Sequence, residues 1–168
     1  MDWSIRTAHP DDAQAIADIS NAIVRDTLVT FSTITKSAAD VAASLAKNPK
    51  AFLVAATVDG VVGFATYGPF RGGPGYRHTQ ELTIHLAPEA RRRGIGRALL
   101  SALEEVARGE DVHVLVSGIS AVNPNAIAFH AAQGFVEVGR MPEVGRKWDQ
   151  WLDLVLMQKR VSAGAESV

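Results

Sequence analysis

The chain has 168 residues, of which 47% are apolar and 21% are charged, with no cysteine and a formal net charge of −1 at pH 7. This length fits one domain, and the lack of cysteine excludes disulfides, thiolate metal sites and a cysteine nucleophile. We expect no metal cofactor. The near-neutral charge argues against nucleic acid or an anionic membrane as the main partner, and no signal-like or roughly 20-residue apolar run is present, so we expect a cytoplasmic protein.

The first third of the chain is predicted to form a strand and two helices. Residues 3–8 are the predicted strand, and Ile16 and Ile23 then lie on one apolar face of a helix. A second helix is predicted to begin at Ser37, where Asp40 provides an imperfect capping box.

A hairpin and a further strand follow. Residues 51–58 and 61–67 are apolar and partly β-branched, and Asp59-Gly60 between them favours a tight hairpin turn. Residues 68–75 contain too much glycine and proline for regular structure and are predicted to form a loop. The alternation of residues 79–86 predicts a strand.

The C-terminal half alternates helices and strands. An amphipathic helix is predicted to end at Gly109, and residues 112–119 form the next strand. Asn123, which is followed by proline, is typical of a helix N-cap, and residues 135–141 and 151–157 are the last two predicted strands.

The complete predicted order is βααβββαβαββ, which indicates a mixed α/β fold with a hairpin in the middle rather than a simple doubly wound sheet. We expect one domain over residues 1–160 and a disordered tail over residues 161–168.

The strongest local motif is Arg91-Arg92-Arg93-Gly94-Ile95-Gly96, directly between a predicted strand and a predicted helix. A helix N-terminus presents unpaired N–H groups and partial positive charge. Gly94 and Gly96 remove side chains that would keep a phosphate from that backbone, and the arginines add charge. The motif therefore predicts a pyrophosphate site.

Other phosphate motifs fit this segment poorly. A P-loop needs a lysine after the glycines, and a dinucleotide fingerprint needs a third glycine where this chain has Leu99. An ordinary glycine-containing turn with solvated arginines stays open as an alternative.

The succession of strand, Arg-x-x-Gly-x-Gly, amphipathic helix, strand, Asn-capped helix and Gly-Phe resembles the GCN5-related N-acetyltransferase superfamily, from Ile5 to Gln158. Within it, the chain looks most like the phosphinothricin and methionine sulfoximine acetyltransferases. The segments that carry this closer resemblance are Thr30-Phe31, Tyr67–Arg71, Gly75–Thr79, Glu81, Asn123, Phe129–Phe135, Val144–Lys147 and Trp151-x-Asp153.

The resemblance implies that acetyl passes from acetyl-coenzyme A to the α-amino group of a small amino-acid analogue. With no cysteine to accept the acetyl group, direct attack in a ternary complex is favoured. The resemblance also implies the cofactor-binding residues: the backbone of Ile84, His85 and Leu86 for the pantetheine arm, then Arg91, Arg92, Arg93, Gly94, Ile95, Gly96, Arg97 and Asn123.

Two catalytic residues are implied in the same way. Glu81 corresponds to the general base, although a solvent-facing strand carboxylate is the alternative. His130 occupies the position of the residue that protonates the leaving thiolate, and imidazole can act as base or acid near neutrality. The alternative for His130 is a helix histidine packed beside Phe129 and Phe135.

Acceptor binding is predicted from residue types in and near the glycine-rich loop. A carboxylate calls for arginine or backbone N–H groups, and aromatic side chains can wall a small pocket. For each residue alone, surface or core packing is the alternative. The candidates are Phe31, Tyr67, Phe70, Arg71, Tyr76, Arg77 and His78.

The chain departs from the family pattern at His85 and at Arg146, Trp148 and Asp149, which bears on substrate choice. Trp148 and Trp151 are expected in the core or in a dimer contact, and a homodimer is expected from the family.

Acetylation of a protein N-terminus or another amine, such as an aminoglycoside, is one alternative function. A non-catalytic coenzyme A-binding sensor is another.

Overall fold

A computed structural model describes residues 2–162 and confirms the predicted α/β class and element order. Three short 3-10 turns lie at Pro10–Asp12, Pro74–Tyr76 and Pro88–Ala90. The helices and strands are β1 (Ser4–Thr7), α1 (Ala13–Asp26), α2 (Ala38–Lys47), β2 (Phe52–Thr57), β3 (Gly60–Pro69), β4 (Thr79–Leu86), α3 (Ile95–Gly109), β5 (Val114–Ser120), α4 (Pro124–Ala132), β6 (Val136–Lys147) and β7 (Gln150–Arg160).

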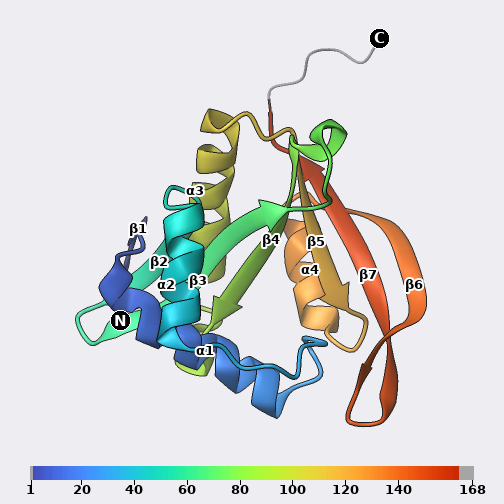
Figure 1. The fold of residues 1–168 in the computed structure, drawn as a ribbon, viewed down its shortest axis with the longest axis horizontal. Helices are drawn as coiled ribbons and strands as arrows, with labels where there is room; N and C mark the ends of the chain where they lie inside the picture. Colours follow the sequence, from blue (N-terminus) through green and yellow to red (C-terminus); the bar gives the residue numbers. More distant parts are fainter. Residues whose placement is uncertain (1, 163–168) are drawn as a thin grey trace.

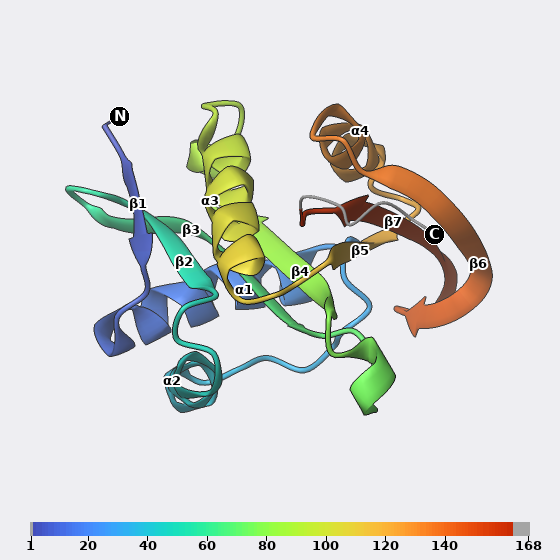
Figure 2. The same ribbon diagram turned by 90° about the horizontal axis from the view of Figure 1, so that it is seen from above.

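The seven strands form one sheet in the order β1-β2-β3-β4-β5-β7-β6. Neighbouring strands are antiparallel except β4 and β5, which are parallel. Helices α1 and α2 cover one face, and α3 and α4 cover the other (Figures 1 and 2). Because both faces are covered, each has its own apolar cluster, with Phe64 on the α1–α2 side and Leu99 and Leu103 on the α3 side.

Side-chain caps begin two of the helices, as the sequence predicts. The Ser37 side chain accepts from the Asp40 N–H at 3.1 Å, and the Asp40 carboxylate accepts from the Ser37 N–H at 2.8 Å. Asn123 accepts from the Ala126 N–H at 3.2 Å. These bonds satisfy N–H groups that a helix leaves unpaired at its first turn.

The C-terminal hairpin is longer than the sequence predicts. β6 continues to Lys147 and β7 starts at Gln150, because Trp148 and Asp149 form a tight two-residue turn with positive φ values of 49° and 59°. Trp148 and Trp151 are 51% and 57% exposed, so they do not lie in the core of the single chain, and the alternative of a dimer contact stays a prediction.

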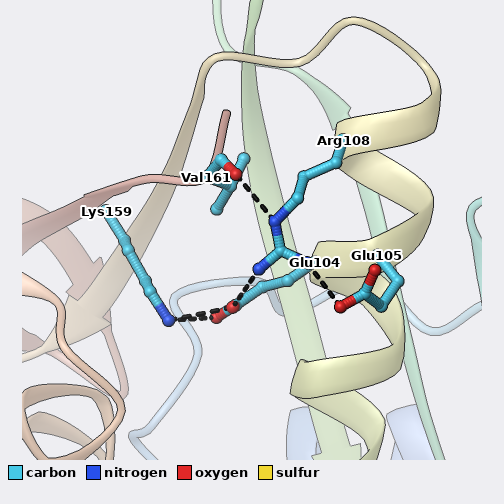
Figure 3. Close-up of polar contacts among 5 residues, drawn as sticks. All are labelled: Glu104, Glu105, Arg108, Lys159 and Val161. Carbon is cyan, nitrogen blue, oxygen red and sulfur yellow. Dashed lines mark hydrogen bonds and ion pairs between the residues drawn. The ribbon is translucent and has the colours of Figure 1, made fainter. Parts of the chain in front are cut away.

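A charged network ties α3 to β7 (Figure 3). The buried Glu104 carboxylate accepts from Lys159 Nζ at 2.7 and 2.9 Å, and Arg108 Nε donates to the Val161 carbonyl at 2.8 Å. This network fixes the helix whose first turn carries the glycine-arginine motif. Val161 is itself buried, so packing continues one residue past the predicted domain end. Residues 163–168 of the predicted tail lie outside the described residues.

Within residues 2–162, no helix combines the length and the apolar character required to span a bilayer.

Candidate active site

A cavity opens where β4 and β5 part. The two strands pair only from Thr79 to Glu81 and from Val114 to Val116, and then diverge (Figure 1). A cavity of about 410 Å³ occupies the gap, lined by residues 81–85 of β4 and 117–120 of β5. Beyond Glu81, β4 therefore faces the cavity with backbone groups that β5 does not bind.

The cavity passes from one face of the sheet to the other. Because side chains alternate along a strand, Glu81 and His85 point toward the α1–α2 side, and Leu82 toward the α3 side. The packing agrees, since the His85 ring meets Phe64 edge-on at 5.4 Å, whereas Leu82 belongs to the α3 cluster. A molecule held between the strands can thus be reached from both sides.

Glu81 lies on the α1–α2 side, close to Gly118 of β5. Its Oε1 atom would lie 3.1 Å from a Cβ atom built on Gly118, so the absent side chain of Gly118 leaves room for the carboxylate. Glu81 is exposed to the cavity, and partial desolvation by the walls raises the pKa of its carboxyl above the ordinary 4.5. A carboxylate with a raised pKa is a stronger base.

His130 lies on the opposite side of the gap and is 3% exposed. Its Nδ1 is 2.8 Å from the Ala126 carbonyl oxygen, and its Nε2 is 3.1 Å from Ser117 Oγ. A carbonyl can only accept, so Nδ1 carries the proton and Nε2 accepts from the Ser117 hydroxyl. Burial lowers the pKa of His130, which keeps the ring neutral.

Both interpretations of His130 from the sequence describe part of its environment. Its ring packs edge-on against Phe129 and Phe135, each at 5.2 Å, and it also lines the cavity. Ser117, its hydrogen-bond partner, is not among the residues singled out from the sequence. The alternation of β5 places Ser117 on the α4 side, but only the tertiary packing of α4 makes it a partner of His130.

The first turn of α3 follows the glycine-arginine motif. Gly94 is the residue before the helix and has a φ of 79°, and no atom lies within 4 Å of the place that its Cβ would take. The N–H groups of the first turn have no partner inside the helix. Arg91, Arg92 and Arg97 are exposed beside them, and Arg93 Nε donates to the Glu89 carbonyl at 2.9 Å. N–H groups without a partner inside the helix, with guanidinium groups around them, fit a diphosphate.

The segment between α1 and α2 forms the other wall of the cavity and is anchored by β6. The Lys147 ammonium is buried and donates to the carbonyls of Val24, Thr27 and Thr30 at 2.6, 2.7 and 3.2 Å. Phe31 lies directly over Gly145, where any side chain would overlap its ring. The end of β6 therefore holds Phe31 at the cavity.

The predicted acceptor residues divide into two groups. Phe31 lines this cavity, and Tyr67 lines an adjoining hollow of about 540 Å³ that shares Ser20, Lys36 and Thr83 with it. The rest lie near the start of β4 and line neither hollow in the described chain: Phe70, Arg71, Tyr76, Arg77 and His78.

These loop residues contact one another instead. The Arg71 guanidinium lies 5.7 Å from the ring centre of Phe70 and 6.0 Å from that of Tyr76. Arg77 Nε donates to His78 Nε2 at 2.7 Å, and His78 Nδ1 lies 2.7 Å from the Asp111 carbonyl oxygen. Their part in acceptor binding stays a prediction.

Known proteins resemble the chain along nearly its full length. The model of the Acetyltransferase (GNAT) family matches residues 16–135. L-amino acid N-acyltransferase MnaT of Escherichia coli is 37% identical, over 97% of this chain and 96% of that protein. An L-methionine sulfoximine/L-methionine sulfone acetyltransferase of Pseudomonas aeruginosa is 36% identical, over 94% of each.

Solved structures have the same fold. A phosphinothricin acetyltransferase of Sinorhizobium meliloti in complex with acetyl-CoA has a TM-score of 0.91 and 31% identity, covering 100% of this chain and 93% of that one. A ribosomal-protein-alanine N-acetyltransferase of Brucella melitensis has a TM-score of 0.88 and 43% identity, covering 94% and 99%.

Proposed function

Because the chain belongs to the Acetyltransferase (GNAT) family, we propose that it moves acetyl from acetyl-CoA to the α-amino group of a small amino-acid analogue. The observation that carries this proposal is the cavity through the sheet, with Glu81 reaching it from one side and His130 from the other. The relatives that act on methionine sulfoximine, methionine sulfone or phosphinothricin support this choice of acceptor.

The donor is proposed to lie along the open edge of β4. N–H groups from Arg93 to Arg97 would hold its diphosphate, with Arg91, Arg92 and Asn123 nearby. The backbone of Ile84, His85 and Leu86 would pair with the pantetheine arm. A backbone N–H that meets the thioester oxygen would stabilise the developing negative charge, a contribution of roughly 3–4 kcal/mol in other enzymes.

Proton movement is proposed to use both sides of the gap. Glu81 accepts a proton from the acceptor ammonium, and the neutral nitrogen attacks the carbonyl carbon as the carbon–sulfur bond breaks. The resting His130 has no proton on Nε2. The second proton of the attacking nitrogen passes through the Ser117 hydroxyl to Nε2, and His130 then gives a proton to the departing sulfur, which leaves as a thiol. The nitrogen therefore loses two protons, one to Glu81 and one through His130 to sulfur.

The charges that line the cavity suit an amino acid. Among the described residues of its lining, Lys36 is the only lysine or arginine and Glu81 is the only acidic residue. Lys36 is placed to attract a carboxylate, while Glu81 takes up the ammonium group. We therefore assign Lys36, rather than the β3–β4 loop of the same chain, as the carboxylate partner within one protomer.

A protein N-terminus is the second candidate acceptor, because of the similarity to the Brucella melitensis structure. The test measures release of coenzyme A thiol from acetyl-CoA with methionine sulfoximine, methionine sulfone, phosphinothricin, plain amino acids and a peptide that begins with alanine. Turnover with the amino-acid analogues supports the proposal. Turnover with the peptide alone would contradict it, and tight coenzyme A binding without any turnover would indicate a sensor.

We further propose that the enzyme is a homodimer that joins through β6. This strand is one edge of the sheet and carries several exposed apolar side chains. They are Val136, Val138, Met141 and Val144, with Trp148 and Trp151 at the following turn. Burying such a surface against a second copy is favourable. The cytoplasmic location and the domain boundary at residue 160 stay predictions.

A further inference from the structure

Two buried polar atoms in the cavity have no partner within the described residues. They are Nδ1 of His85, on β4, and Oγ of Ser120, on β5. Ser120 is only 2% exposed, and both residues line the cavity. Buried polar atoms are nearly always hydrogen-bonded, and leaving one unpaired is costly. Two such atoms in one cavity therefore point to a ligand that completes them.

The two atoms belong to the same side of the sheet as the proposed base. His85 is four residues after Glu81, and Ser120 is two residues after Gly118, which lies beside the Glu81 carboxylate. Strand alternation therefore turns His85, Ser120 and Glu81 toward the α1–α2 side. His85 and Ser120 also lie on opposite walls, because β4 and β5 border the gap from either side. This is the acceptor half of the cavity rather than the half that faces α4.

The chemistry of the pair indicates a neutral, oxygen-bearing partner. Desolvation and the nearby Lys36 lower the pKa of His85 to about 4, so the ring is uncharged near neutrality. A neutral imidazole and a hydroxyl offer hydrogen bonds but no countercharge, and Lys36 is already assigned to the acceptor carboxylate. Phe64 packs edge-on against the imidazole and restricts its movement.

We infer that His85 and Ser120 form a specificity site that hydrogen-bonds neutral oxygen atoms in the side chain of the acceptor amino acid. The inference rests on the proposed acetyltransferase function and narrows its substrate class. Acceptors with a sulfone-like or amide-like side chain offer oxygen atoms to these buried groups, whereas an apolar side chain of similar length leaves them unpaired. The site thus discriminates because a wrong acceptor leaves buried polar atoms without hydrogen bonds, which weakens its binding.

The test compares kcat/KM for methionine sulfone and methionine, which differ only in the two oxygens on sulfur. The variants are His85→Phe, which keeps a ring beside Phe64, and Ser120→Ala. The wild type is expected to prefer the sulfone, and each variant is expected to reduce that preference about tenfold, as expected for losing one buried hydrogen bond. For Ser120→Ala, methionine turnover should stay within about threefold of the wild type.

The matched control is Ser32→Ala. Ser32 also lines the cavity, but its hydroxyl already has a partner in the Ile34 carbonyl at 3.3 Å, so the sulfone preference should be unchanged. If His85→Phe does not fold, Ser120→Ala tests the inference by itself. Equal losses with both acceptors, no change in either variant, or weaker acetyl-CoA binding instead would overturn the inference. Wild-type turnover without any sulfone preference would overturn it while leaving the proposed function intact, and no wild-type turnover would overturn both.

Discussion

At the residue scale, the two proposed catalytic side chains are both displaced toward their neutral forms. Desolvation raises the pKa of Glu81 and lowers the pKa of His130. For the carboxyl the change strengthens the base, and for the imidazole it leaves a proton acceptor near neutrality. Glu81 accepts a proton only as the carboxylate, above its raised pKa, whereas the neutral His130 has an unprotonated Nε2, and the two groups act from opposite sides of the gap between β4 and β5.

Replacing Glu81 with glutamine should remove the base without changing its shape. We expect kcat to fall roughly 10²- to 10⁴-fold. In the wild type, kcat/KM should fall as the pH drops through the pKa of Glu81, above the ordinary 4.5, because the protonated carboxyl cannot accept a proton. Steady-state pH profiles should show this acid limb in the wild type and in Glu89→Gln, an exposed control, and not in Glu81→Gln. An unchanged limb in Glu81→Gln would assign it to another group.

Replacing His130 with phenylalanine should keep the packing between Phe129 and Phe135 and remove both ring nitrogens. We expect kcat to fall roughly 10²-fold or more, with KM for acetyl-CoA nearly unchanged. Ser117→Ala leaves the ring in place but breaks the contact to Nε2, so we expect a smaller loss, about tenfold. Steady-state kinetics with melting temperatures for both variants test this. Unaltered kcat in His130→Phe would make the histidine a packing residue.

At the element scale, the acceptor wall depends on a strand far from it in sequence. Lys147 on β6 holds carbonyls at the end of α1 and in the following segment, more than a hundred residues earlier. A cation at the carbonyls that end a helix is favourable, and removing it would leave these buried carbonyl oxygens without a hydrogen-bond donor. The segment Val144–Lys147, noted in the sequence, thus holds Phe31 in position at the cavity.

Lys147→Met should loosen that wall and leave the donor site intact. We expect KM for the acceptor to rise about tenfold and stability to fall by about 1–3 kcal/mol, while acetyl-CoA affinity stays within about twofold. Calorimetric titration, kinetics and denaturant unfolding measure these quantities. The control is Lys50→Met, since Lys50 makes an exposed ion pair with Glu110 and should have little effect. A loss of acetyl-CoA affinity in Lys147→Met would contradict this role.

Local signals sufficed for the element order but not for the cavity. Ser37, Asn123 and Asp59-Gly60 act through neighbours a few residues away, so the sequence shows them directly. The gap depends instead on where the pairing of β4 and β5 stops, and α3 separates these strands in the chain. Ser117 and Ser120 reach the cavity through that non-local pairing, and Lys36 reaches it through the packing of the segment between α1 and α2, which explains why no sequence pattern indicated them.

The C-terminal hairpin illustrates the same limit. Trp148 and Asp149 carry no glycine or asparagine signal for a tight turn, although both adopt positive φ. The sequence therefore predicted a wider connection. The arginine-bearing loop after β3 was expected near the acceptor from its residue types alone, but its side chains pair among themselves at the start of β4.

At the scale of the whole molecule, the apolar edge at β6 predicts assembly. Val138→Lys combined with Met141→Lys should place two charges in the proposed interface and convert the dimer into a monomer of 17.9 kDa. Sedimentation velocity measures the mass. Val58→Lys, at a 97% exposed site in the β2–β3 turn, should leave the dimer intact. A wild-type monomer at micromolar concentration, or a dimer in the double variant, would contradict assembly through β6.

The position of the donor follows from the sheet, the cavity and the first turn of α3 taken together. The crystal structure of the complex with acetyl-CoA tests it most directly. The account predicts diphosphate oxygens about 2.7–3.2 Å from the N–H groups of residues 93–97, with the pantetheine arm running between β4 and β5 toward Glu81. Density for the nucleotide at another surface, with the turn at Gly94 making no phosphate contact, would contradict it.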